Sequence, residues 1–137
     1  MPDISMTQAD ANVALIASGY DAFARGDIPA VLAIFDKNIH WQIPGRSPLA
    51  RDVRGHGAVH GFFKQLAESS NGTLRVSVDD ILAKGDRVVA LVTVSARRGE
   101  RTWSSPSVHV WTLRNNRVVE MREYLGDEHG ADEFWSA

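Results

Sequence analysis

The apolar residues in the first half of the chain recur at the spacing of helices. Those of the segment from about residue 7 to residue 25 fall on one face of a helix: Val13, Ile16, Tyr20 and Phe23. Gly26 ends that helix, and Asp27 can cap a second, short helix that tolerates Pro29 in its first turn. A third helix is predicted over about residues 57–68. Its buried face holds Val59, Phe62, Phe63 and Leu66.

The rest of the chain alternates between apolar and polar residues, and turn-forming residues separate the alternating runs. A first strand spans about residues 38–43 and stops at Pro44-Gly45. Four further strands are predicted at residues 73–83, 87–96, 102–113 and 117–125. Hairpins between them are indicated by Gly85, Gly99 and Asn115-Asn116. The pattern therefore predicts an α+β fold in which three helices pack on one curved, mainly antiparallel sheet.

Length and composition narrow the class of protein. The 137 residues fit a single domain over residues 1–137, with residues 1–6 as a loose leader. A net charge of −2 gives no electrostatic reason to expect nucleic acid or an anionic membrane as a partner. The absence of cysteine excludes a disulfide scaffold, a thiolate metal site and a cysteine nucleophile. No signal peptide or run of roughly 20 apolar residues is present, so we expect a cytoplasmic protein.

Three segments resemble the polyketide-cyclase-like (SnoaL-like) and ketosteroid-isomerase-related members of the nuclear transport factor 2-like superfamily. They are Tyr20-Asp21-Ala22-Phe23 with Arg25-Gly26-Asp27, Trp41 to Leu49 followed by Arg54-Gly55, and Arg117 to Tyr124. The resemblance covers nearly the whole chain and implies the cone-shaped fold of that superfamily. It specifies the reaction only weakly, because the fold carries isomerases, cyclases, dehydratases, epoxide hydrolases and non-enzymes.

The three polar groups of a ketosteroid isomerase are missing. That enzyme needs a base aspartate, and a tyrosine and a protonated aspartic acid as oxyanion donors. The resemblance puts Ile43 at the base, Val108 at the acid and Gly19 at the tyrosine. Tyr20 is one residue away, which is a rotation of roughly 100° around a helix. Steroid isomerisation of that kind is therefore not expected.

One carboxylate remains inside the cone that the resemblance implies. Met121, Glu123 and Leu125 lie on the pocket side of the last strand, because side chains alternate along a strand. A desolvated carboxylate is a candidate general acid or base, and Tyr20 is a candidate for orienting the substrate. The expected walls are Trp41, Ile43, Phe63, Val108, Met121 and Leu125. The alternatives are that Glu123 is exposed or pairs with an arginine such as Arg54.

These residues favour binding of an apolar small molecule and, if the protein is an enzyme, proton transfer without a cofactor on a carbonyl compound. The product would arise by isomerisation, cyclisation or elimination. A rival is a non-catalytic binding or dimerisation module whose cone is packed shut. A second rival is addition of water to an epoxide, which requires a second polar pair near Thr93 and Ser95.

Other polar and aromatic residues are assigned to surfaces. Trp103, His109 and Trp111 are expected on the outer sheet face, where they would form a homodimer interface. His56 and His60 have the i, i+4 spacing of a metal site but no third ligand, so no metal is expected. The arginines of the loop before the third helix favour a solvated segment: Arg46, Arg51 and Arg54. The tail from residue 128 to 135 can pack Phe134 and Trp135 over a pocket or a dimer edge.

Overall fold

The computed structural model describes residues 7–136, which form four helices and six strands. The helices are α1 (Gln8–Ala24), α2 (Ile28–Ala33), α3 (His56–Ser69) and α4 (Glu128–Ser136). The strands are β1 (Phe35–Ile43), β2 (Arg51–Arg54), β3 (Arg75–Lys84), β4 (Arg87–Arg98), β5 (Arg101–Arg114) and β6 (Arg117–Leu125). The predicted α+β class is confirmed, and the predicted leader over residues 1–6 lies outside the described residues.

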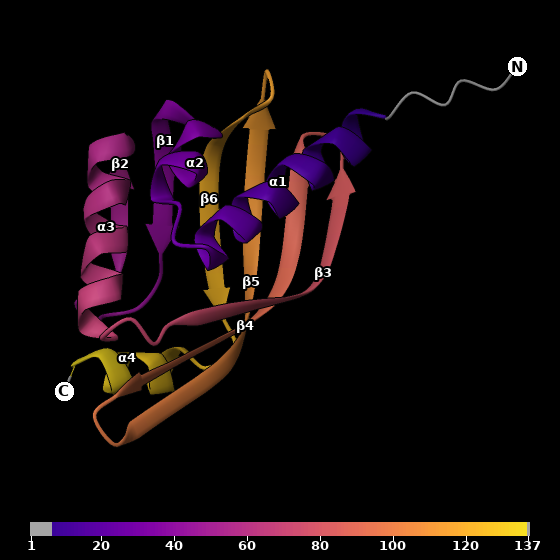
Figure 1. Cartoon of the computed structure of the whole chain (residues 1–137). Helices are drawn as coiled ribbons and strands as arrows, with labels where there is room; N and C mark the ends of the chain where they lie inside the picture. Colours follow the sequence, from indigo (N-terminus) through magenta and orange to yellow (C-terminus); the bar gives the residue numbers. More distant parts are fainter. Residues whose placement is uncertain (1–6, 137) are drawn as a thin grey trace, which may run out of the picture.

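All six strands belong to one sheet, in the order β2-β1-β6-β5-β4-β3. Only β1 and β6 pair in parallel, and the other four pairs are antiparallel. Figure 1 shows that α1 crosses the concave face of the sheet and that α3 lies beside β1 and β2. Side chains of the helices and of the sheet therefore meet in the space between the two layers.

Local sequence signals explain where the helices begin and end. Thr7 caps α1 by accepting a hydrogen bond from the Asp10 amide, and Asp27 caps α2 in the same way. Gly26 separates these helices at a φ of 73°, a conformation that favours glycine. Asn115 and Asn116 take positive φ in the β5–β6 turn, as the sequence predicts.

The strand missed by the sequence is β2, which lies in the predicted polar loop. It pairs with the second half of β1, from His40 opposite Arg54 to Ile43 opposite Arg51. With four residues, three of them charged, β2 lacks the apolar alternation that marks a strand. Pairing with β1 supplies its backbone hydrogen bonds instead.

The C-terminal helix α4 closes the lower end of the sheet, beside the curled β4–β5 hairpin (Figure 1). Phe134 and Trp135 are buried there and pack on Trp103 of β5. Arg98 of β4 donates to the backbone carbonyl of Phe134 at 2.6 Å. No helix within residues 7–136 is long and apolar enough to cross a membrane.

Candidate functional site

An apolar cavity lies between the concave sheet face and the helices, with a volume of about 120 Å³. Most of its walls are aromatic or aliphatic side chains, and the sequence-predicted residues among them are Tyr20, Trp41, Ile43, Phe63, Met121, Glu123 and Leu125. Trp41 contacts the rings of Phe35, Phe62, Phe63 and Trp111. The cone is thus neither open to solvent along its length nor packed shut.

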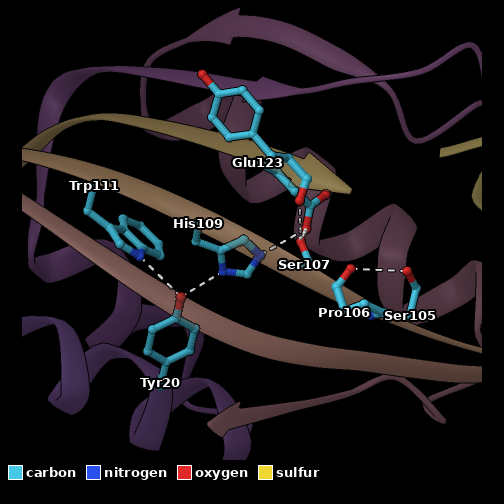
Figure 2. A network of polar contacts seen from close by, with 8 residues as sticks. Tyr20, Ser105, Pro106, Ser107, His109, Trp111 and Glu123 are labelled. Atoms are coloured by element: carbon cyan, nitrogen blue, oxygen red, sulfur yellow. Dashed lines mark hydrogen bonds and ion pairs between the residues drawn. The ribbon is translucent and has the colours of Figure 1, made fainter. Parts of the chain in front are cut away.

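Four polar side chains from three elements form a continuous chain of hydrogen bonds in this cavity (Figure 2). The indole Nε1 of Trp111 donates to the Tyr20 hydroxyl at 3.1 Å. The same hydroxyl lies 2.6 Å from Nδ1 of His109. Nε2 of His109 lies 2.8 Å from Oε2 of Glu123. Helix α1 therefore meets strands β5 and β6 through a tyrosine, a histidine and a carboxylate in series.

One arrangement of protons satisfies every contact of this chain. An indole N–H can only donate, so the Tyr20 oxygen accepts from Trp111. With the proton of His109 on Nε2, the Tyr20 O–H donates to Nδ1, and Nε2 donates to the Glu123 carboxylate. In this tautomer each contact holds one proton, and the hydrogen bonds run in one direction from Trp111 to Glu123.

Burial holds Tyr20 in its neutral form. Desolvation raises the pKa of the Tyr20 hydroxyl well above its ordinary value, and the nearby charge of Glu123 acts in the same direction. The hydrogen bond from Trp111 opposes this shift but is the smaller effect. The Tyr20 hydroxyl therefore keeps its proton at neutral pH and can donate a hydrogen bond.

The Glu123 carboxylate has one occupied and one available oxygen. Ser107 Oγ donates to Oε2 at 3.0 Å, the oxygen that also faces His109. Among the described residues, Oε1 accepts no hydrogen bond. The carboxylate is thus fixed in orientation by Oε2, while Oε1 is free to meet a ligand in the cavity. Neither Arg54 nor any other described arginine pairs with it.

The expected facing of β5 is wrong. The residues that point into the cavity are His109 and Trp111, and Val108 lies on the outer face, so it is not a wall of the pocket. A regular two-residue hairpin at Asn115-Asn116 would pair Val108 with Glu123, because Arg114 pairs with Arg117. A bulge at residue 119 adds one residue to β6, so that His109 stands opposite Glu123.

The residues expected in the dimer interface are misplaced as well. Trp103, His109 and Trp111 all line the cavity and cannot supply an outer surface. A homodimer through the outer sheet face stays a prediction, and its contacts would come from other residues. The sequence does carry a signal for the inner face of β5. Trp103, His109 and Trp111 are each an even number of residues from the buried Leu113, so all four lie on the same face of the strand.

The remaining sequence candidates lie outside the network. His56 Nε2 lies 2.8 Å from the Phe35 carbonyl oxygen, and His60 is exposed. No group of three potential metal ligands occurs within residues 7–136. In the loop before α3, the amides of Arg46 and Ser47 donate to Asp132 of α4, which lines the cavity. That loop is therefore tied to the helix that closes the cone.

A family comparison agrees with this architecture. The model of the SnoaL-like domain matches residues 16–121, which is more than half of the chain. The chain belongs to the SnoaL-like family. The matched span includes Tyr20, His109 and Trp111 and ends just before Glu123. The resemblance seen in the sequence is confirmed.

Relatives of this SnoaL-like chain cover nearly its whole length. Rv0034 of Mycobacterium tuberculosis (strain ATCC 25618 / H37Rv), described as uncharacterized, is 27% identical over 93% of this chain and 98% of its own. Bal32a, from a soil-derived mobile gene cassette, has a TM-score of 0.91 at 32% identity over 94% of this chain and 99% of that one. A putative SnoaL-like polyketide cyclase from Jannaschia sp. CCS1 has a TM-score of 0.80 at 19% identity, over 100% and 99%. This last likeness shows the fold alone.

Proposed function

We propose that this SnoaL-like protein binds an apolar carbonyl compound in its cavity and transfers a proton on it without a cofactor. One observation carries the proposal. Glu123 is a largely buried carboxylate, 12% exposed, whose Oε2 is held by His109 and Ser107 and whose Oε1 has no partner among the described residues, in a cavity with aromatic walls. A fixed, desolvated carboxylate beside apolar surface is suited to general acid–base catalysis.

The proposed step starts with the carbon next to the ligand carbonyl. Its C–H bond breaks, the proton forms an O–H bond with Oε1 of Glu123, and the electron pair moves into an enolate whose charge rests on oxygen. Where a C=C bond of the ligand is conjugated with the enolate, return of the proton to the far carbon isomerises the ligand. Where the β-carbon carries a leaving group, that group departs with its bonding electron pair, and the enolate electrons form the new C=C bond. His109 positions the carboxylate through Oε2, and neutral Tyr20 fixes the tautomer of His109.

The cavity size limits the ligand. A volume of about 120 Å³ is close to that of an apolar cavity of about 150 Å³ that accommodates benzene. We therefore expect a ligand of about one six-membered ring with a carbonyl group. Larger ligands would extend toward α4 and the loop tied to it by Asp132.

The rival of epoxide hydration finds less support. It needs a polar pair near Thr93 and Ser95 that positions a water, but neither residue lines the cavity. The Thr93 hydroxyl instead donates to Asp79 at 3.0 Å on the exposed side of the sheet. The other rival, a non-catalytic module whose cone is packed shut, does not fit a cavity of about 120 Å³. A module that binds the same ligand without proton transfer is the form of that rival which the exchange experiment below tests.

Exchange of carbon-bound protons for deuterium tests the proposal. Cyclohexanone, 2-cyclohexenone and acetophenone would be incubated with the protein in D₂O, and loss of the α-proton signal followed by proton NMR. We expect acceleration by the wild type and a drop of roughly 100-fold or more in Glu123→Gln, as for removal of a general base. Glu120→Gln, on the same strand but outside the cavity, should keep the wild-type rate.

Two results would contradict it. Equal rates for Glu123→Gln and the wild type would remove Glu123 from the reaction. Saturable binding of all three ketones with no exchange would leave the binding module as the function.

A further inference from the structure

Two indole N–H groups are buried without a hydrogen-bond acceptor, and both belong to cavity walls. Among the described residues, the buried side-chain nitrogen and oxygen atoms with no partner are Nε1 of Trp41 and Nε1 of Trp103. Both tryptophans line the cavity. Buried polar groups without a partner are rare in native proteins, and each asks for an explanation. Their shared location in the cavity walls points to a ligand as the missing acceptor, and such a ligand would have to displace the atoms that cover each nitrogen.

Trp41 is the more deeply placed of the two. Its side chain is 4% exposed and is surrounded by aromatic rings, none of which offers a strong acceptor. The edge contact with Phe63, at 5.4 Å between ring centroids, could give its N–H at most a weak π contact. The neighbouring Trp111, whose ring centroid lies 6.0 Å from that of Trp41, donates its N–H to the Tyr20 hydroxyl. Trp41 is thus the unsatisfied donor next to the network.

The strand register brings Trp41 close to Glu123. Met121 is paired with Trp41 on β1 and with Trp111 on β5, and Glu123 is two residues further along the same strand face. Two residues of a strand span roughly 7 Å. This is the spacing of backbone positions, and it puts the two side chains on one wall of the cavity, where a single ligand can meet both.

Tyr20 is less available for the carbonyl oxygen. Its O–H is engaged with Nδ1 of His109, and its oxygen already accepts from Trp111. We propose that the Nε1–H of Trp41, and not the Tyr20 hydroxyl, is the donor that binds the carbonyl oxygen of the ligand. The ligand class is then a ring ketone whose oxygen is an acceptor without a proton of its own. This inference rests on the proposed function for the class of ligand but concerns binding alone.

A pair of ligands of equal shape isolates this hydrogen bond. Cyclohexanone carries the acceptor, and methylenecyclohexane replaces the carbonyl oxygen by a CH₂ group. The affinity for each probe is first corrected for the solubility of that probe in water. After this correction, we expect the wild type to bind cyclohexanone about tenfold more tightly than methylenecyclohexane, which corresponds to one buried hydrogen bond. Trp41→Phe removes the donor and keeps an aromatic ring, so this variant should bind the two probes about equally. Trp135→Phe should keep the preference for cyclohexanone.

A second measurement needs no variant that changes the core. The chain has four tryptophans, so the ¹⁵N-labelled wild type has four indole N–H signals. Titration with cyclohexanone should move the Trp41 signal downfield, and methylenecyclohexane should not.

Several outcomes would overturn the inference. They are a downfield shift confined to Trp103, a preference that survives in Trp41→Phe, and wild-type protein that binds both probes equally or neither. Failure of the proposed function is a separate result, because it is read from deuterium exchange. Cyclohexanone bound at Trp41 without exchange would reject proton transfer and keep the donor assignment.

Discussion

Two histidine–carboxylate pairs lie on opposite faces of the same sheet. His109 and Glu123 join β5 to β6 on the inner face, with 2.8 Å between Nε2 and Oε2. His40 and Asp52 join β1 to β2 on the outer face, with 2.5 Å between Nε2 and Oδ1. The outer contact is the shorter, yet only the inner pair lies in the apolar cavity, whereas His40 borders a polar depression on the outer face. Distance alone therefore does not single out the pair of the candidate site.

Burial and connectivity separate the two pairs. The inner side chains are 11% and 12% exposed, whereas Asp52 is 75% exposed. The outer pair extends only to Gln42, 3.3 Å from His40 Nδ1, while the inner pair continues to Tyr20 and Trp111. Water competes much more for the outer carboxylate than for the inner one. The two histidine–carboxylate pairs should then differ in how much each contributes to the free energy of unfolding.

The largest expected difference is in stability after removal of each carboxylate. Glu123→Ala leaves His109 Nε2 without its partner and the Ser107 hydroxyl with only the longer contact to the Tyr124 carbonyl, so we expect the free energy of unfolding to fall by about 2–4 kcal/mol. Asp52→Ala removes an exposed pair and should cost less than about 1 kcal/mol. Urea denaturation of both variants measures the contrast. Equal losses would mean that burial does not distinguish the pairs.

A smaller effect is expected from Tyr20→Phe. It removes the hydroxyl that accepts from Trp111 and donates to His109, at a cost of about 1–2 kcal/mol at neutral pH. The folded state raises the pKa of Tyr20 above its unfolded value of about 10. The folded protein therefore holds this proton more tightly, and the associated stability is complete below about pH 10 and is lost as the pH rises above it.

Denaturation at a series of pH values tests this dependence. The wild type should lose up to about 1.4 kcal/mol per pH unit above pH 10 through Tyr20, and Tyr20→Phe should lack that component. Tyr124→Phe is the matched control, because Tyr124 is 51% exposed on the outer face and should keep the wild-type slope. The same slope in Tyr20→Phe and the wild type would show that Tyr20 is not the group that titrates.

The fold was predictable because its signals are local and repeated. Helical spacing marks α1 and α3, and alternation between turn residues marks β3 to β6. The errors fall where pairing decides the structure. β2 is polar and forms by pairing with β1, and the bulge at residue 119 changes which residue of β5 faces Glu123.

The site was only partly predictable, since its members are far apart in sequence. Tyr20 and His109 are separated by 89 positions, and no periodic pattern links them. The inner face of β5 carries Ser107 and His109, whereas the outer face carries Val108 and Val110, so the apolar pattern there points the wrong way. Functional sites depart from hydrophobic patterning in this manner because their chemistry needs polar groups inside.

The smallest expected effect on stability concerns the outer face. Cross-strand pairing places Leu91, Val108 and Tyr124 in one apolar row over β4, β5 and β6. If two copies meet there, as the sequence resemblance implies, the wild type should sediment at twice the 15.1 kDa of one chain. Leu91→Lys should then sediment as a single chain. Ala67→Lys, at an exposed position of α3, should sediment as a dimer like the wild type. At high dilution, the free energy of unfolding of Leu91→Lys should stay within about 0.5 kcal/mol of the wild type, because the residue is 38% exposed. A wild type that sediments with the mass of a single chain would reject the dimer, and the apolar row of the outer face would then not bind a second copy of the chain.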